Sequence, residues 1–130
     1  MEKISEKKRF SLVARLRSSD HALRGLNVLI KTCHHLWVEI VFIILGIYLG
    51  FVLHISNIEW VLVVFAFGLV VIAEAFNTAI EIDIDLTSPT YHPYARDTKD
   101  VAGGAVALAV VVAGIMGALI FLPKVIALVF

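Results

Sequence analysis

The sequence contains little that a disulfide-bonded or nucleic-acid-binding protein needs. Its 130 residues include one cysteine, Cys33, so no disulfide can form within the chain. Charged residues make up 17% of the chain, and eleven basic side chains balance eleven acidic ones. Without a basic excess or a recognisable motif, we expect no nucleic-acid partner. The length suits one domain, and residues 1–130 are predicted to form it.

Apolar residues dominate what is present. They make up 60% of the chain, and the mean hydropathy is +0.93, whereas an ordinary globular domain contains about 45–50% apolar residues. A helix that crosses a bilayer core needs about 20 mostly apolar residues. Three runs meet this requirement, and we predict membrane spans at about 36–55, 60–82 and 100–122. The sequence therefore predicts an all-α membrane protein with three transmembrane helices.

Residues 1–35 have a different composition. In this segment, apolar side chains recur at helical spacing from residue 10 to residue 31, and basic residues alternate with them. This pattern is typical of an amphipathic helix on a membrane surface. A soluble helix packed against a partner is the alternative. The segment lacks the apolar run and small-residue cleavage site of a signal peptide, so we expect the N-terminus to be retained. The basic residues are Lys3, Lys7, Lys8, Arg9, Arg15, Arg17, Arg24 and Lys31.

Charge in the connecting segments predicts the orientation. The N-terminal segment holds eight of the eleven basic residues, the predicted loop 83–99 adds Arg96 and Lys99, and the turn 54–59 has none. The positive-inside rule therefore places the N-terminus and the loop 83–99 in the cytoplasm. Pro123 and Lys124 are predicted to end the third span on the opposite side.

A stripe of polar residues follows the second apolar run. Glu74, Asn77, Glu81 and Asp85 lie at offsets 0, 3, 7 and 11, which fall on one face of a helix. A charge at the centre of a membrane costs about 2.5–3.5 kcal/mol on insertion scales, so the stripe indicates a site at the interface. The alternative is that these groups satisfy contacts between helices or mark the frayed end of the span.

A second polar cluster precedes the third span. A lysine there could pair with phosphate, and an acidic residue could orient it. In the alternative, Lys99 extends to the membrane surface and Asp100 supplies an N-terminal helix charge. Gly103, Gly104 and Ala107 follow at spacings that favour close helix packing, within the chain or between copies. The members of this cluster are Tyr91, His92, Arg96, Lys99 and Asp100.

Together the two clusters contain the residue types that phosphoryl transfer needs. These are carboxylates for a divalent metal, a cation for phosphates, and a group that positions the attacking hydroxyl. The residue types alone would also suit a small proton-coupled transporter built on Glu74. Residue types alone therefore leave two classes of function open.

The order of residues distinguishes between these two classes of function. Segment 74–81, with the sequence EAFNTAIE, resembles the signature of the bacterial diacylglycerol kinase family, which includes the undecaprenol kinases. In that family an aspartate follows four residues after the second glutamate, then a Tyr-His pair, then Lys-Asp before a helix of small residues. Asp85, Tyr91-His92 and Lys99-Asp100 occur here at the matching spacings. The strong resemblance covers about residues 73–106, and segment 88–93 (SPTYHP) resembles the undecaprenol kinase version of the loop.

The resemblance implies a lipid kinase in the bacterial cytoplasmic (inner) membrane. It implies a domain-swapped homotrimer with sites formed between protomers, ATP as phosphoryl donor, Mg²⁺ as cofactor, and a membrane lipid alcohol as acceptor, with undecaprenol favoured over diacylglycerol. Glu74 corresponds to the base or positioning group for the lipid hydroxyl, Asn77 to its polar neighbour, and Glu81 to a metal ligand. Lys99 and Asp100 correspond to the pair that engages the nucleotide phosphates. Asp85 and His92 correspond to further family positions at the nucleotide site.

One departure concerns the metal. Counted from Gly25, which corresponds to a family glycine, the family's metal-binding glutamate falls at Cys33. The nearest carboxylate, Glu39, lies six residues further on, and we expect that it cannot fill the same place. Either Glu81 holds the metal with water, or another carboxylate holds it, or Cys33 or a flanking histidine, His34 or His35, acts as a softer ligand. A relative without catalytic activity is a further alternative.

Overall fold

The computed structural model describes residues 12–33 and 35–130, with side chains described from residue 19 onward except at residue 34. All regular secondary structure in these residues is helical, which confirms the all-α prediction. The side chains of the six basic residues up to Arg17 lie outside the described part of the chain. The helices are α1 (Leu12–Thr32), α2 (Leu36–Val52), α3 (Asn57–Thr87) and α4 (Pro93–Val129).

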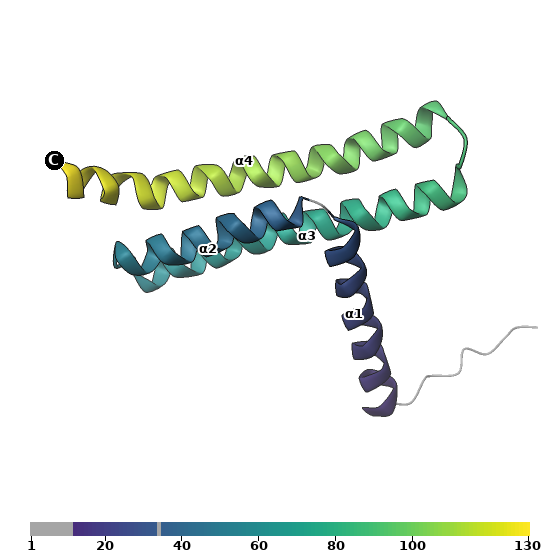
Figure 1. The fold of residues 1–130 in the computed structure, drawn as a ribbon, viewed down its shortest axis with the longest axis horizontal. Coiled ribbons are helices and arrows are strands. Elements are labelled where there is room, and N and C mark those ends of the chain that lie inside the picture. Colours follow the sequence, from purple (N-terminus) through teal and green to yellow (C-terminus); the bar gives the residue numbers. More distant parts are fainter. Residues whose placement is uncertain (1–11, 34) are drawn as a thin grey trace, which may run out of the picture.

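Three of the helices run roughly parallel to one another. Figure 1 shows α2, α3 and α4 side by side, with α1 leaving the bundle steeply where it joins α2. The segments Ser19–Thr32 and Leu36–Val52 are bent by 101° relative to each other. The contact between α3 and α4 is the most extensive between any two helices, and α2 packs mainly against α3. The junction of α1 and α2 therefore lies against the middle of α3.

Two helices are long and apolar enough to cross a membrane. They are α3, with 31 residues, and α4, with 37. With 17 residues, α2 lies at the lower limit of about 17–25 for a spanning helix. It belongs to a third candidate span if the bent pair of α1 and α2 counts as one. Three complete spans thus remain a prediction.

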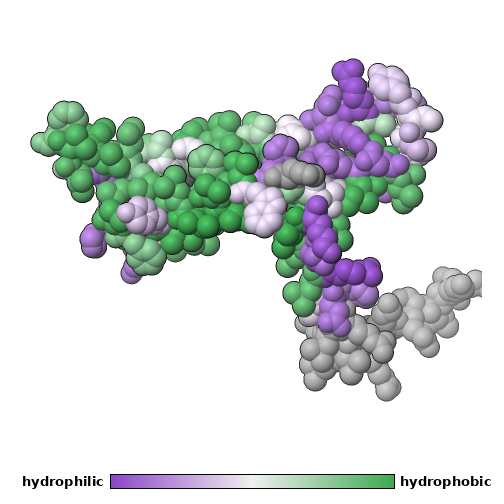
Figure 2. All heavy atoms as spheres, viewed as in Figure 1, coloured by the Kyte–Doolittle hydropathy of each residue, from purple (hydrophilic) through white to green (hydrophobic). Residues whose placement is uncertain are grey.

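The surface has the character of a membrane protein. Large apolar side chains are exposed along α2, α3 and α4. In Figure 2 they cover most of the bundle, while hydrophilic residues gather on α1 and at the end where α3 meets α4. Exposed apolar area on this scale exceeds what a soluble monomer shows and is suited to lipid contact.

The predicted loop at 83–99 is wrong in its extent. α3 continues to Thr87 and α4 already begins at Pro93, so only residues 88–92 are not helical. Asp83 and Asp85 alternate with apolar residues and extend the helix beyond the apolar run. Proline is favoured in the first turn of a helix because its missing N–H has no helical partner there. The charges in this region therefore mark the polar ends of two long helices.

The third span is predicted to end at Pro123, but the helix itself does not end there. Pro123 lies inside α4, which continues to Val129. Proline removes one backbone hydrogen bond, but helices in a membrane tolerate it because neighbouring groups can satisfy the freed carbonyl. Lys124, the next residue, forms an ion pair of 3.2 Å with Glu59 at the start of α3.

The turn between α2 and α3 is defined by local hydrogen bonds. Glu59 Oε2 accepts from the Ser56 N–H at 2.6 Å, and Ser56 Oγ accepts from the Glu59 N–H at 3.3 Å. This capping box satisfies N–H groups that a helix start leaves without helical partners. Glu59 thus both caps α3 and binds Lys124, which fixes this end of α3 against α4.

Close approach between α2 and α3 depends on two glycines. A Cβ atom at Gly46 would lie 2.7 Å from the Phe67 ring, and one at Gly50 would lie 2.6 Å from the Trp60 ring. Gly103 and Gly104 behave differently, because a Cβ atom there would meet nothing within 4 Å. Among the described residues, the predicted close packing at Gly103 and Gly104 therefore does not occur, and contact between copies remains the prediction for them.

Candidate functional site

The site is built where the junction of α1 and α2 meets α3. Leu29, Cys33 and Leu36 form a buried apolar cluster there, with Ala75 of α3 packed against it. This packing brings the end of α1 against the turn of α3 that carries Glu74. Glu74 is only 5% exposed, so its carboxylate is removed from solvent.

A pocket of about 460 Å³ opens beside Glu74. Three members of the predicted polar stripe, Glu74, Asn77 and Glu81, line it from the same face of α3. α4 contributes small side chains to the opposite wall, which leaves room for a ligand. The lining residues are Thr32, Cys33, His35, Glu74, Asn77, Thr78, Glu81, Gly103, Val106 and Ala107.

Asn77 and Glu81 form a linked pair in this pocket. Asn77 Nδ2 donates a hydrogen bond to Glu81 Oε1 at 3.0 Å. Asn77 Oδ1 is buried and has no hydrogen-bond partner among the described residues. Because buried polar atoms are nearly always satisfied, this oxygen is available for a donor or a cation. The pair offers carboxylate and amide oxygens, which are ligands that Mg²⁺ accepts.

Cys33 contacts Glu74 directly. Its Sγ donates a hydrogen bond to Glu74 Oε2 at 3.5 Å, and the thiol is 8% exposed. Burial raises the pKa of the Cys33 thiol, and the nearby charge of Glu74 raises it further. Cys33 therefore carries its proton at neutral pH, as the hydrogen bond requires.

Glu39 approaches Glu74 from α2. The two carboxyl groups are close enough to interact electrostatically, and Glu39 Oε2 is buried without a hydrogen-bond partner in the described chain. Two ionised carboxylates in a dry environment repel each other, so a proton or a cation near the pair stabilises it. Glu39 does not line the pocket with Asn77 and Glu81. From the sequence, its approach to Glu74 was not expected.

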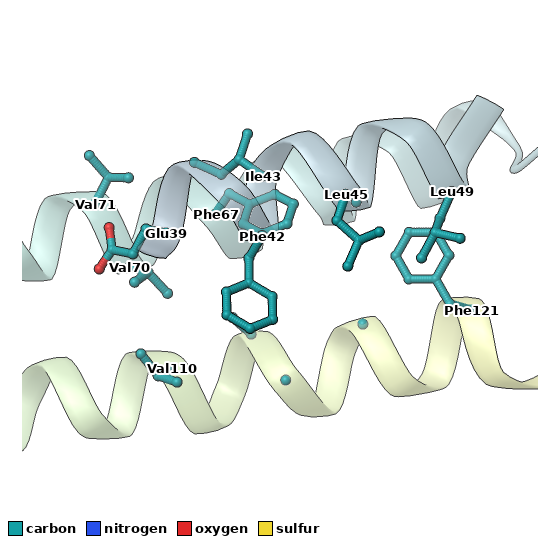
Figure 3. A pocket seen from close by; sticks show the side chains of 14 residues that line it. Glu39, Phe42, Ile43, Leu45, Leu49, Phe67, Val70, Val71, Val110 and Phe121 are labelled. Atoms are coloured by element: carbon teal, nitrogen blue, oxygen red, sulfur yellow. The ribbon is translucent and has the colours of Figure 1, made fainter. Parts of the chain in front are cut away.

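Glu39 instead marks one end of an apolar groove. Figure 3 shows Glu39 beside Val70 and Val71 at one end, and Leu49 with Phe121 at the other. The groove has a volume of about 320 Å³ and runs between α2, α3 and α4. Glu39 is the one charged residue among those that line it. The others are Phe42, Ile43, Leu45, Gly46, Leu49, Phe67, Val70, Val71, Val110, Ala113, Gly114, Gly117 and Phe121.

The second predicted cluster lies apart from the pocket, at the polar end of α3 and α4. Lys99 forms an ion pair with Asp85 across the two helices, and Arg96 binds Asp100 at 3.4 Å within α4. None of these four residues lines the pocket with Glu74. Asp100 is not in the first turn of α4, which contains no acidic residue. The interpretation of Asp100 as an N-terminal helix charge is therefore wrong.

His92 has a structural role in this region. It is the N-cap of α4, and its Nδ1 accepts a hydrogen bond from the Tyr94 N–H at 3.3 Å. Such a cap satisfies one of the N–H groups at a helix start. Tyr91, the other member of the predicted Tyr-His pair, is exposed.

Two polar lining residues were not anticipated from the sequence. They are Thr32, at the end of α1, and Thr78, which follows Asn77 on α3. His35, an alternative soft metal ligand in the sequence, also lines the pocket, whereas His34 lies outside the described residues. Thr78 is 5% exposed, and its position next to Asn77 was the one signal that could have identified it. The position of Thr32 at the pocket follows only from the bend, which brings the junction of α1 and α2 onto α3.

Comparison with known proteins identifies a family that matches most of the chain. The model of the family described as prokaryotic diacylglycerol kinase matches residues 20–121. An undecaprenol kinase from Bacillus subtilis is 44% identical over 75 residues, which cover 58% of this chain and 61% of that protein. A diacylglycerol kinase from Synechocystis sp. is 40% identical over 77 residues, which cover 58% of this chain and 44% of that protein. The matched part spans less than two thirds of either relative.

Proposed function

The chain belongs to the prokaryotic diacylglycerol kinase family, and from this premise we propose that it phosphorylates the hydroxyl of a membrane lipid alcohol with ATP. The observation that carries the proposal is the buried carboxylate of Glu74, which shares a pocket with Asn77 and Glu81. A lipid hydroxyl and a nucleotide can meet at such a site because it lies close to both the apolar bundle and its polar end.

Glu74 acts on the lipid hydroxyl. Its carboxylate accepts the hydroxyl proton while the hydroxyl oxygen attacks the γ-phosphorus in line. The bond from the γ-phosphorus to the bridging oxygen breaks, and ADP leaves. No phosphoenzyme forms, because both substrates are held in one site and proximity supplies much of the rate enhancement. Asn77 is the polar neighbour of Glu74, and it keeps Glu81 in place through its hydrogen bond.

Mg²⁺ fits the oxygen atoms on this face of α3. Glu81 and the unpaired Oδ1 of Asn77 are the residues that would hold it, and it would neutralise charge on the phosphates when bound. No group of three or more His, Cys, Asp or Glu side chains within the described residues could hold a metal ion. One or two protein carboxylates with phosphate oxygens are the usual coordination of Mg²⁺ at such sites. We therefore propose that the ion arrives with ATP.

The polar cluster of a second protomer completes the site. Its residues are Lys99, Asp100, Asp85 and His92. They lie at the polar end of α3 and α4, and a single chain does not bring them to Glu74. A homotrimer with sites shared between protomers would unite the two clusters, and the open surface at Gly103 supports close approach by another copy. Residues 1–130 then form one kinase domain in the bacterial inner membrane, with the N-terminus in the cytoplasm.

The apolar groove receives the hydrocarbon chain of the lipid. Glu39 lies at one end of the groove and interacts with Glu74, so the groove reaches the carboxylate that acts on the hydroxyl. A lipid alcohol with its hydroxyl at Glu74 and its hydrocarbon chain in the groove matches the change from polar to apolar surroundings. The Bacillus subtilis relative is an undecaprenol kinase with the higher of the two identities, and it supports undecaprenol over diacylglycerol.

The acceptor lipid is tested with purified protein in mixed micelles, labelled γ-phosphate of ATP and saturating magnesium. We expect label in undecaprenol, with less in diacylglycerol at equal mole fraction. Preference for diacylglycerol would contradict the proposed acceptor but not the lipid kinase. If neither lipid is labelled, the kinase proposal fails. Substrate uptake driven by a pH gradient without ATP would then favour a transporter, and nucleotide binding without turnover a non-catalytic relative.

The magnesium requirement tests the role of Glu81. Glu81→Gln should raise the magnesium concentration at half-maximal rate by about tenfold, because changes around a bound metal commonly cost this much affinity. Cys33→Glu should lower that concentration, because it adds a carboxylate to the same pocket. Each midpoint is measured at fixed ATP and compared with Asp83→Asn, an exposed carboxylate on the same helix. Equal midpoints in the wild type and the three variants would show that Glu81 does not bind the metal.

Filling the groove tests the position of the lipid chain. Gly117 lines the groove and a Cβ atom there would meet nothing within 4 Å, so Gly117→Leu adds a side chain that starts in open space. We expect a severalfold higher KM for the lipid and an unchanged KM for ATP. Gly68→Leu is the matched control, because Gly68 also has open space but does not line the groove. An unchanged lipid KM would contradict the proposed position of the lipid chain. Loss of the oligomer in the Gly117 variant alone would show that another copy occupies the groove.

A further inference from the structure

Glu74 accepts a hydrogen bond from Cys33, a residue without a role in the phosphoryl transfer proposed above. The Cys33 thiol lies at the junction of α1 and α2 and donates to Glu74 Oε2 at 3.5 Å. Both side chains are more than nine-tenths buried, so water does not compete freely for this contact. The apolar neighbours Leu29 and Leu36 fix the position of the thiol.

The surroundings of Glu74 make this donor important. Glu39 faces Glu74 from α2, and Glu81 and His35 line the same pocket. α4 contributes no titratable side chain to the pocket wall. A carboxylate at position 33 would add another negative charge next to Glu74 and would need a cation between them. A thiol has no charge at neutral pH, so it can bind Glu74 without any ion.

We propose that Cys33 is a positioning residue for Glu74 in the lipid kinase reaction. The thiol engages Oε2 and fixes the carboxylate rotamer, which leaves Oε1 to accept the proton of the lipid hydroxyl. Catalytic groups act best when their orientation is fixed before the reaction, since a small misplacement raises the barrier. The role rests on the proposed function, because it requires that Glu74 act on a lipid hydroxyl.

The contact itself can be tested without any activity. Cys33 is the one cysteine of the chain, so alkylation by iodoacetamide reports this thiol alone. Glu74→Gln should lower the pKa of the Cys33 thiol, because it removes a negative charge that disfavours the thiolate. We expect alkylation at a fixed pH near 8 to become about three- to tenfold faster, because a lower pKa raises the fraction of reactive thiolate.

Glu81→Gln is the matched control for alkylation. Glu81 lines the same pocket but does not contact Cys33, and the rate in this variant should equal that of the wild type. Equal rates in the wild type and in Glu74→Gln would show that the contact is absent and would overturn the proposal. An equal acceleration in both variants would also overturn it, because the effect would then come from the pocket as a whole.

The positioning role is tested by two substitutions at Cys33. Cys33→Ala should lower kcat about tenfold and leave the KM for ATP unchanged, whereas Cys33→Ser, which keeps a donor, should restore most of kcat. Thermal unfolding in micelles checks that both variants fold. A full kcat in the alanine variant, or equal losses in both variants, would contradict the role. If the wild type phosphorylates no lipid, the proposed function and the role fail together, while alkylation still shows whether Cys33 binds Glu74.

Discussion

The structure depends on the burial of one carboxylate at a crossing of helices. Glu74 lies in an apolar stretch of α3 and is almost fully covered by the junction of α1 and α2. An ionised group in such a place is costly unless polar neighbours compensate it. Cys33 supplies a hydrogen bond from the junction, whereas the second carboxyl group, that of Glu39 on α2, requires a proton or a cation beside the pair. The bend between α1 and α2 makes both contacts possible, because a straight helix could not bring Cys33 and Glu39 to Glu74 together.

Much of the fold follows from the sequence, because periodicity and apolar length act locally. The helical character and the stripe of Glu74, Asn77 and Glu81 required only the 3.6-residue repeat and the length of the apolar runs. The helix ends were harder. Charges at Asp83 and Asp85 looked like a loop, and Pro123 looked like a helix end, although α3 and α4 continue through them. Composition describes the environment of a residue, and it is a poor guide to whether the backbone remains helical there.

The site was predicted less completely than the fold. The shared face of α3 could be derived from spacing, whereas the contact of Cys33 with Glu74 depends on a bend that no local pattern announces. Glu39 illustrates the same limit, since six residues separate it from Cys33 and only the geometry of the junction places both near Glu74. The cluster of Lys99 and Asp85 lies outside the pocket. In the account proposed here a second protomer unites the two, which no property of a single chain could reveal.

The most direct test of this account compares the wild type with Glu74→Gln in the same micelles, measuring labelled lipid and ATP affinity together. We predict a loss of lipid phosphorylation of at least about a hundredfold, the lower limit of what a general base contributes, with ATP affinity within about twofold. Asp83→Asn removes an exposed charge from the same helix and should keep both values. A Glu74→Gln protein that phosphorylates lipid at the wild-type rate would contradict the central role of this carboxylate.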